Sequence, residues 1–396
     1  MVCASVGLRE KAGTGVPAFD WGENLGCQSA QTGGRGNFWL GVLLDPPSET
    51  GRIPGTEMII VLKSGITKKQ EAGVLQEIRK RGYKPHVMRG VARTVVGAIG
   101  DELTHASLDT LATQFPNVVE SVMPVQKRYK LVSREAHPAN STVKVRDQII
   151  GGKKFQIMAG PCSVESEKQL LTTAVAVKAA GATILRGGAF KPRTSPYEFQ
   201  GLGEKGLKLL AKARKETGLA IITELLSEHH AELIAEYTDI IQIGARNAQN
   251  FQLLIAAAKT GKPVLLKRGL SMKIEEWLLA GEYVLANNNS GLMFCERGIR
   301  TFETYTRNTL DLSTIPIIKK ESHAPIVIDP SQGAGRADLV AAMCKGAVAM
   351  GADALLIEVH PNPAEAWSDG AQQVSLELFA QLMQELRPFI AAAGRE

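Results

Sequence analysis

A short basic run follows the β-branched segment 182–184 and combines cations with hydroxyl groups. Arg186, Lys191 and Arg193 lie within eight residues, and Thr194 and Ser195 follow directly. A phosphorylated ligand suits such a run, because one guanidinium group can donate to two phosphate oxygens at once and hydroxyl groups add further donors. A solvated basic loop is the alternative, since basic loops are common on protein surfaces. The run predicts a phosphate site if other segments bring further cations beside it.

The second half of the chain alternates short apolar segments with amphipathic ones. Strands are expected near residues 155–159, 183–187, 219–223, 239–243, 263–267, 292–295, 325–329 and 354–359. Helical stretches separate most of them, and a last helix is expected near 374–392. Eight strand–helix units in about 245 residues are typical of a TIM (β/α)8 barrel of the α/β class. A doubly wound open sheet is the alternative, but no GxGxxG follows the first strand, which disfavours a Rossmann fold.

Charged residues follow many of these expected strands. In a barrel, the carboxyl ends of the strands meet at one face, where catalytic residues gather. Cations follow four of the strands, at Arg186, Arg246, Lys267 and Arg297. Clustered cations repel one another unless anions join them, so this convergence predicts an anion-rich ligand set such as a phosphate plus a carboxylate.

A second set of residues combines soft and hard metal ligands. Cys162, Glu358 and Asp369 offer one thiolate and two carboxylates, which is a reasonable set for a divalent metal ion. Spacing alone is weak support, and a small buried hydrophobe is the commoner role of a cysteine such as Cys162.

The chain divides into four segments. Residues 1–57 are rich in Gly, Ser, Thr and Pro without periodicity, which predicts a disordered extension or an upstream mis-assigned start, with the true start at Met58. Residues 58–124 predict the order βαββαβ of a ferredoxin-like domain. Its elements are expected at 58–63, from Thr67 (with Gln70 placed for a capping box), near 85–89, 93–99, 105–114 and 118–122. Residues 125–150 are expected to form a linker with one or two strands, and 151–396 the barrel.

Composition limits the classes of partner. The 396 residues are 44% hydrophobic and 22% charged, as in ordinary globular proteins, with a net charge of +6. The basic residues are spread out, so anionic small molecules are expected as ligands and nucleic acid is not. The five cysteines are scattered and odd in number, which favours a reducing cytoplasm. We expect neither a membrane span nor a secretory signal.

Together, the motifs resemble the type I beta group of 3-deoxy-D-arabino-heptulosonate 7-phosphate (DAHP) synthases over about residues 58–396. The matching motifs are AGPCSVES (159–166), LRGGAFKPRTSPYEFQGLG (185–203), IGARN (243–247), LLKRG (265–269), CERGIRTFE (295–303), RNTLDLS (307–313) and EVHP (358–361). The resemblance implies a transferase that condenses phosphoenolpyruvate with erythrose 4-phosphate, the first step of the shikimate pathway to chorismate and the aromatic amino acids.

The resemblance also implies roles for single residues. Phosphoenolpyruvate would be held by Arg186, Lys191, Arg246, Lys267 and Arg297. Erythrose 4-phosphate would be held by Pro192, Arg193, Thr194 and Ser195. Glu224 would orient a water, and catalytic roles fall to Lys191, Glu224, Cys162 and Asp329. The spelling KPRTS follows the four-carbon form, whereas the related octulosonate synthase, for a five-carbon sugar, has a different pair after this lysine.

The implied metal site departs from the family at one position. A divalent metal such as Mn²⁺ would be held by Cys162, Glu358 and Asp369, but the family motif DPSH reads Asp-Pro-Ser-Gln here, ending at Gln332. Gln332 ligates through its amide oxygen with a shift toward harder ions, or His360 contributes from the strand face of Glu358, or metal binding is weak. We favour a retained but altered site, because buried phosphate-binding cations are costly to keep without a ligand.

Two alternatives to the heptulosonate synthase stay open at this point. One is 3-deoxy-manno-octulosonate 8-phosphate synthase, and the other is a metal-impaired, ligand-sensing relative that has lost the metal histidine. The resemblance further implies regulation by an aromatic amino acid at the ferredoxin-like domain and a homo-oligomer, commonly a tetramer.

Overall fold

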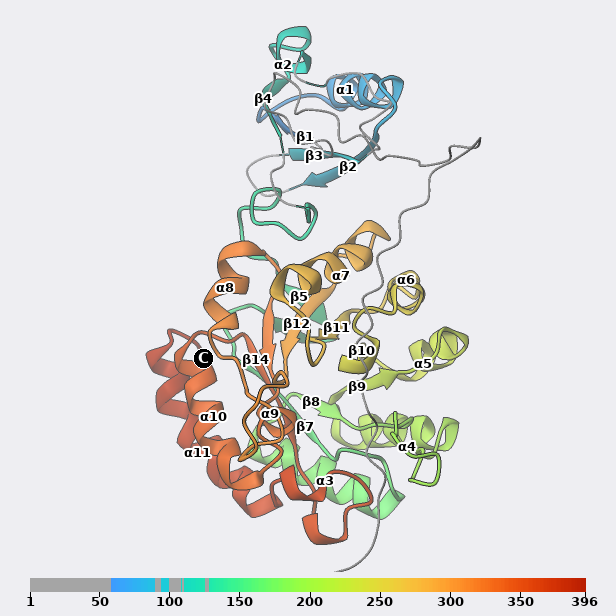
Figure 1. Ribbon diagram of the computed structural model, residues 1–396, viewed down its shortest axis with the longest axis vertical. Helices are drawn as coiled ribbons and strands as arrows, with labels where there is room; N and C mark the ends of the chain where they lie inside the picture. Colours follow the sequence, from blue (N-terminus) through green and yellow to red (C-terminus); the bar gives the residue numbers. More distant parts are fainter. Residues whose placement is uncertain (1–57, 90–93, 100–107, 109, 125–127) are drawn as a thin grey trace, which may run out of the picture. The chain divides into compact units, whose positions relative to one another are not determined.

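The computed structural model describes residues 58–89, 94–99, 108, 110–124 and 128–396 (Figure 1). The expectation of a disordered or mis-assigned segment 1–57 lies outside these residues. So do residues 105–107 and 109 of the helix expected at 105–114; the described part of that segment forms the short helix α2 (Leu111–Gln114).

The first part of the chain forms a four-stranded antiparallel sheet. Its strands are β1 (Met58–Leu62), β2 (Lys84–Arg89), β3 (Thr94–Ile99) and β4 (Val119–Pro124), in the order β2-β3-β1-β4. Helix α1 (Lys68–Lys80) begins with the predicted capping box, in which the Thr67 hydroxyl accepts from the Gln70 backbone and the Gln70 side chain accepts from the Thr67 backbone. Val74 and Ile78 bury the inner face of α1 against Ile60 and Leu62 of β1. The predicted ferredoxin-like domain is confirmed.

Eight parallel strands close into a barrel in the second part. In chain order they are β7 (Gln156–Gly160), β8 (Ile184–Arg186), β9 (Ala220–Leu225), β10 (Ile240–Ile243), β11 (Val264–Lys267), β12 (Leu292–Glu296), β13 (Ile326–Ile328) and β14 (Ala354–Glu358). Each strand pairs with the next, and β14 pairs with β7, from Ala354 opposite Gln156 to Glu358 opposite Gly160. The predicted TIM barrel is confirmed.

Helices cover the outside of the barrel. They are α3 (Glu167–Ala180), α4 (Glu204–Thr217), α5 (Ala231–Tyr237), α6 (Phe251–Lys259), α7 (Ile274–Ala286), α8 (Thr314–Glu321), α10 (Ala337–Ala349) and α11 (Leu376–Ala392). The strands are buried on both faces, as parallel strands under helices must be. Large side chains such as Trp277 and Phe294 fill the layer between strands and helices, whereas Met158, Ile222 and Leu265 belong to a separate cluster inside the barrel.

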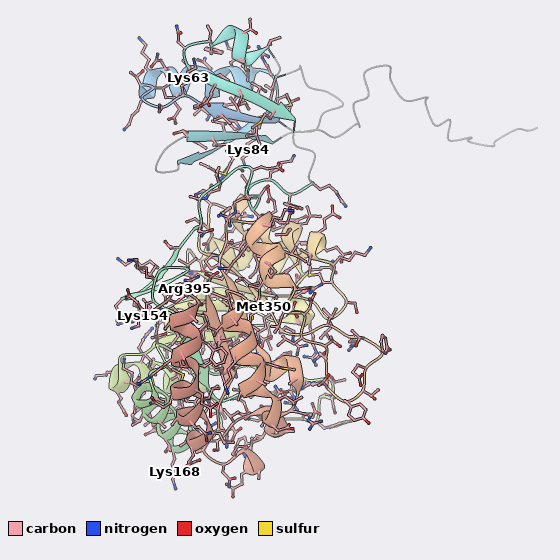
Figure 2. All side chains as sticks on the ribbon, turned by 90° about the vertical axis from the view of Figure 1, so that its left-hand side faces the viewer. Lys63, Lys84, Lys154, Lys168, Met350 and Arg395 are labelled. Atoms are coloured by element: carbon pink, nitrogen blue, oxygen red, sulfur yellow. The ribbon has the colours of Figure 1, made fainter. Side chains whose placement is uncertain are left out.

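The amino-terminal end of the barrel is closed by local pairings. The hairpin of β5 (Val143–Val145) and β6 (Gln148–Ile150) packs its buried side chains on the interior cluster. The last residue, Glu396, exchanges backbone hydrogen bonds with Lys153 and Phe155 just before β7. Lys154 and Arg395 mark this region in Figure 2. Catalytic groups are therefore to be sought at the other end, where the strands finish.

Candidate active site

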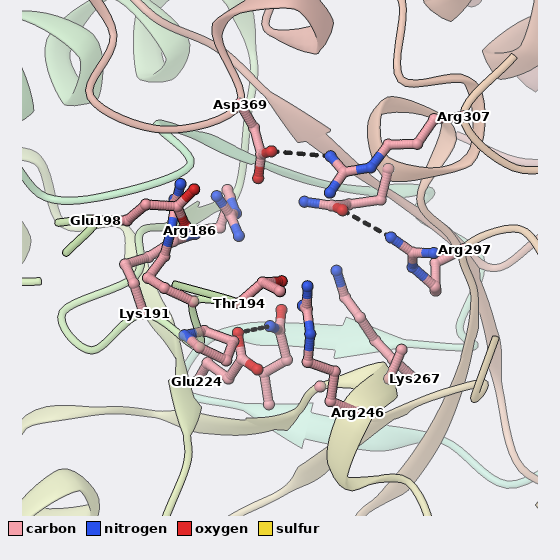
Figure 3. Close-up of a pocket in the computed structure, with 16 residues that line it drawn as sticks. Arg186, Lys191, Thr194, Glu198, Glu224, Arg246, Lys267, Arg297, Arg307 and Asp369 are labelled. Carbon is pink, nitrogen blue, oxygen red and sulfur yellow. Dashed lines mark hydrogen bonds and ion pairs between the residues drawn. The ribbon is translucent and has the colours of Figure 1, made fainter. Parts of the chain in front are cut away.

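A polar pocket of about 250 Å³ lies beyond the carboxyl ends of the strands (Figure 3). Among the described residues that line it, seven are cations and three are carboxylates. The cations are Arg186, Lys191, Arg193, Arg246, Lys267, Arg297 and Arg307, and the carboxylates are Glu198, Glu224 and Asp369. This excess of positive charge in a concave site fits ligands that carry several negative charges.

The opening basic run supplies one wall of the pocket. Arg186 is the last residue of β8 and is almost fully buried; its Nη1 donates to the carbonyl of Pro161 at 2.6 Å and lies 3.2 Å from Glu358. Its Nε has no hydrogen-bond partner among the described residues. A buried guanidinium N–H without a partner is costly, so this atom suits a bound anion.

Arg297, which follows β12, is a second buried cation. Within the described part of the chain it has no carboxylate at ion-pair distance, and its Nη2 donates to the amide oxygen of Gln332 at 2.7 Å. Burial lowers the pKa of Arg297, because the charged form loses water without gaining a full counter-charge. An anionic ligand would supply that counter-charge.

Lys267 and Arg268 are neighbours in sequence but face different surroundings. Lys267 ends β11, lines the pocket and pairs with Asp329 at 2.5 Å. Arg268 instead forms a buried network with Glu296 and Asp311, at 2.9 and 3.0 Å. The alternation of side chains along β11 separates these two cations: Leu265 belongs to the interior cluster and Leu266 to the layer under the helices, so Lys267 faces inward and Arg268 outward.

The Glu224 carboxylate lines the pocket. It lies on β9, and Gln242 of β10 donates to its Oε2 at 3.3 Å. Gly244 leaves room for this carboxylate: a Cβ at position 244 would meet Glu224 Oε1 at 1.9 Å. A side chain at 244 would therefore displace Glu224.

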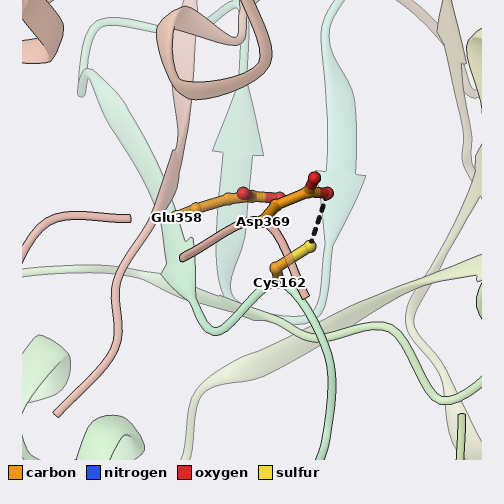
Figure 4. A group of neighbouring side chains, drawn as sticks. All are labelled: Cys162, Glu358 and Asp369. Carbon is orange, nitrogen blue, oxygen red and sulfur yellow. Dashed lines mark hydrogen bonds between the residues drawn. The ribbon is translucent and has the colours of Figure 1, made fainter. Parts of the chain in front are cut away.

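Three side chains beside the pocket form a group with metal-ligand chemistry (Figure 4). Single ligand atoms of Cys162, Glu358 and Asp369 lie within 4.8 Å of one another. Cys162 Sγ lies 3.3 Å from Asp369 Oδ2, and Lys191 Nζ lies 2.9 Å from the same sulfur. The thiol and two carboxylates fit a divalent ion with three protein donors.

Electrostatics sets the protonation of this group. Burial, followed by the neighbouring charge of Glu358, raises the pKa of Cys162 to about 12. Burial alone would raise the pKa of Asp369, but Arg307 and Lys191 lower it to about 2. Asp369 is therefore ionised at neutral pH, whereas Cys162 carries its proton until a metal displaces it.

Gln332 lies next to the group, in the first turn of α9 (Pro330–Ala334). Asp329 caps this short helix by accepting from the Gln332 backbone N–H at 2.9 Å, and Pro330 occupies its first position. The Gln332 side-chain NH2 donates to Glu358 Oε1 at 3.1 Å, so the amide oxygen faces Arg297 and not the metal-ligand group.

His360 does not join the metal-ligand group. Its Nε2 lies 3.2 Å from Glu165 Oε2, and Glu165 also accepts from the Trp367 backbone at 2.9 Å. Strand alternation places His360 on the same side as Glu358. The His360 ring nevertheless contacts Glu165 and not Cys162.

The structure brings most of the expected site residues together. All five cations of the phosphoenolpyruvate set line the pocket, as do Pro192, Arg193 and Thr194. Ser195 does not line it, and its hydroxyl accepts from the Tyr197 backbone instead. The sequence assigns no role to Arg307, Glu198 or Gln372, although Glu198 lies in the quoted motif 185–203 and Arg307 begins the quoted motif 307–313.

Fold and site define a barrel protein whose strand ends form a strongly cationic pocket beside a three-donor metal-ligand group. The family model of the DAHP synthetase I family matches residues 133–392. The model of the DAHP synthase ferredoxin-like domain matches residues 58–127. The chain belongs to the DAHP synthase family.

Individual relatives agree with this assignment. A phospho-2-dehydro-3-deoxyheptonate aldolase of Thermotoga maritima is 50% identical over 339 residues, or 85% of this chain and 99% of that protein. A crystal structure of the Thermotoga maritima DAHP synthase matches with a TM-score of 0.68 at 49% identity, covering 86% of this chain and 99% of that one. A 2-dehydro-3-deoxyphosphooctonate aldolase of Koribacter versatilis is more distant, at 31% identity over 61% of this chain and 94% of that protein.

Proposed function

We propose that this chain condenses phosphoenolpyruvate with D-erythrose 4-phosphate and water to give DAHP and inorganic phosphate. The observation that carries the proposal is the pocket in which seven cations face three carboxylates at the strand ends. Two phosphorylated substrates, one of them also a carboxylate, account for that charge. The 50% identical Thermotoga maritima relative supports the choice of the seven-carbon product.

The buried cations would hold phosphoenolpyruvate. Arg186 and Arg297 each lack part of their hydrogen bonding or counter-charge in the described residues, and Lys191, Arg246 and Lys267 line the same space. Asp329 would keep the Lys267 ammonium in place through their 2.5 Å contact. Fixed cations around phosphate and carboxylate would orient C3 of the enol for attack on the aldehyde carbon of the sugar.

Pro192, Arg193 and Thr194 would hold the phosphate of the sugar at the more open side of the pocket. Arg193 pairs with Glu198 at 2.8 Å, so binding a phosphate would exchange one anion for another. Ser195, which faces the loop backbone, would join the phosphate after a turn of its side chain. As the new C–C bond forms, water adds at C2 and the phosphate leaves; Glu224, held by Gln242, would orient that water.

Cys162, Glu358 and Asp369 would hold a divalent metal ion, Mn²⁺ or a similar ion. When bound there, the ion would supply Lewis-acid polarisation of the sugar aldehyde. Lys191 contacts both the sulfur and the carbonyl oxygen of Cys162, and so would keep the thiolate near the phosphoenolpyruvate cations.

The test is phosphate release from phosphoenolpyruvate with either erythrose 4-phosphate or the five-carbon arabinose 5-phosphate, each with Mn²⁺. Release with the four-carbon sugar that EDTA abolishes supports the proposal. Release only with the five-carbon sugar would assign the octulosonate synthase instead, and no release with any metal would favour a ligand-sensing relative.

We also propose that the ferredoxin-like domain binds an aromatic amino acid and inhibits the enzyme, and that the protein is a cytoplasmic homo-oligomer, most simply a tetramer. The match of residues 58–127 to a domain specific to DAHP synthases supports the first point. Cys162, Cys295 and Cys344 are unpaired and buried, which suits a reducing compartment. No helix in the described ranges is long and apolar enough to cross a bilayer. Turnover that is insensitive to tyrosine, phenylalanine and tryptophan would discard the regulatory role.

A further inference from the structure

Two glutamines hold the Glu358 carboxylate from opposite sides. The side-chain NH2 of Gln332 donates to Glu358 Oε1 at 3.1 Å, and that of Gln372 donates to Oε2 at 2.7 Å. Gln332 comes from α9 after β13, whereas Gln372 comes from the loop between β14 and α11. Two separate loops therefore place the same chemical group on one carboxylate.

Each glutamine also accepts from an arginine of the pocket. Arg297 donates to Gln332 Oε1 at 2.7 Å, and Arg307 donates to Gln372 Oε1 at 3.1 Å. Both arginines line the pocket. The result is a continuous chain of hydrogen bonds, Arg297–Gln332–Glu358–Gln372–Arg307, with Glu358 at its centre.

The direction of both amides follows from their partners. A carboxylate can only accept and a guanidinium can only donate, so the NH2 must face Glu358 and the oxygen must face the arginine. The Gln332 oxygen that a metal ion would need is therefore directed at Arg297, and the NH2, which cannot ligate a metal, is directed at Glu358. Turning the amide over would set its NH2 against the guanidinium, donor against donor.

We propose that Gln332 is a positioning residue and not a metal ligand: it ties Arg297 to Glu358, as Gln372 ties Arg307. Resting on the proposed function, this means that the metal is held by three protein side chains, Cys162, Glu358 and Asp369, and that Gln332 instead orients a cation of the phosphoenolpyruvate site. Gln332 links substrate binding to the metal-ligand group through two hydrogen bonds.

The experiment compares Gln332→Met with the matched control Gln372→Met, since each removes one donor from Glu358 and one acceptor from an arginine. Co²⁺ is titrated into each purified protein without substrate, and the thiolate-to-cobalt absorption of Cys162 gives the dissociation constant. The two constants should agree within about threefold, because each variant removes one hydrogen-bond donor from Glu358, while Arg307 keeps its 2.8 Å ion pair with the third ligand, Asp369. Weakening of Co²⁺ binding by about tenfold or more in Gln332→Met alone would identify Gln332 as a ligand and overturn the proposal.

Phosphoenolpyruvate binding, measured by calorimetry without the sugar, is the second readout. Gln332→Met should weaken it by about tenfold, because Arg297 loses the acceptor that orients it. Unchanged phosphoenolpyruvate affinity in a Gln332→Met protein with a wild-type circular dichroism spectrum would overturn the positioning role.

A crystal structure of the wild-type protein loaded with Mn²⁺ decides the point without any variant. The Arg297–Gln332 hydrogen bond should persist, and bonding of the Gln332 oxygen to the ion would overturn the proposal. None of these readouts requires turnover, so failure of the inference stays distinct from failure of the proposed reaction, which wild-type phosphate release tests by itself.

Discussion

The Lys191 ammonium lies 2.9 Å from the sulfur of Cys162, so the basic loop after β8 is in direct contact with the metal-ligand group. Lys191 is almost fully buried and also donates to the Cys162 carbonyl oxygen at 3.1 Å. A cation in contact with the sulfur favours the thiolate, whereas burial and the charge of Glu358 oppose it, and the balance keeps the pKa of Cys162 at about 12.

Metal binding is therefore expected to release one proton from Cys162. Metals bind the thiolate, and at neutral pH the metal must displace the thiol proton, so affinity should rise by about tenfold per pH unit. Asp369, with a pKa of about 2, is already ionised and contributes no proton. Calorimetry in buffers with different ionisation enthalpies measures the proton count. Cys162→Ser is the control: it should bind the metal more weakly and release no proton.

Gln332→His adds an imidazole beside the three-donor group and removes the amide bridge. Because imidazole is a better donor than an amide toward Co²⁺ and Zn²⁺, we expect affinity for these ions to rise by about tenfold or more. The measurement is competition with a chelating dye. If the substitution neither tightens metal binding nor raises turnover, position 332 cannot reach the metal. That result would exclude every side chain at position 332 as a metal ligand, and not only the glutamine.

Gly244→Ala should displace Glu224, because the new Cβ would lie 1.9 Å from Glu224 Oε1. Loss of a group that positions a reacting water is expected to lower kcat by about tenfold to a hundredfold, with little change in the free energy of unfolding. Gly73→Ala is the matched control, since its Cβ meets nothing within 4 Å. Equal kcat in the two variants would remove Glu224 from the reaction.

His323 should make the fold sensitive to acid. Its Nε2–H donates to Leu131 O at 2.8 Å, its Nδ1 accepts from Ser141 at 2.7 Å, and burial lowers its pKa from 6.5 to about 4. Below about pH 6.5 the unfolded chain takes up a proton that the folded chain refuses, so stability falls between about pH 6.5 and 4, by up to about 3 kcal/mol.

The measurement is urea unfolding of the wild type and of His323→Gln. Between about pH 7 and pH 5, the wild type should lose about 2 kcal/mol more stability than the variant, which carries no titrating group at this position. An identical loss in both proteins would show that other groups control the acid response.

The sequence by itself determined the architecture and most of the pocket. Alternating apolar and amphipathic segments placed eight strands, and parallel strands that close into a barrel must bring their carboxyl ends together. Arg186, Arg246, Lys267 and Arg297 could be assigned to one site for that reason alone. The position of each cation at the end of a strand follows from the local sequence. Closure of the barrel then brings the strand ends, and so the cations, close to one another.

Only the tertiary structure decided how those groups are partnered. Arg268 turns from the pocket to Glu296, Ser195 faces its own loop, and Arg307 enters from a distant segment. The amide direction of Gln332 depends on Arg297 and Glu358, which follow other strands. The neighbours that folding brings close decide which end of an amide donates and which accepts. In the sequence, a glutamine in place of a metal-ligand histidine therefore indicates only a lost ligand. In the structure, the same glutamine connects Arg297 to Glu358.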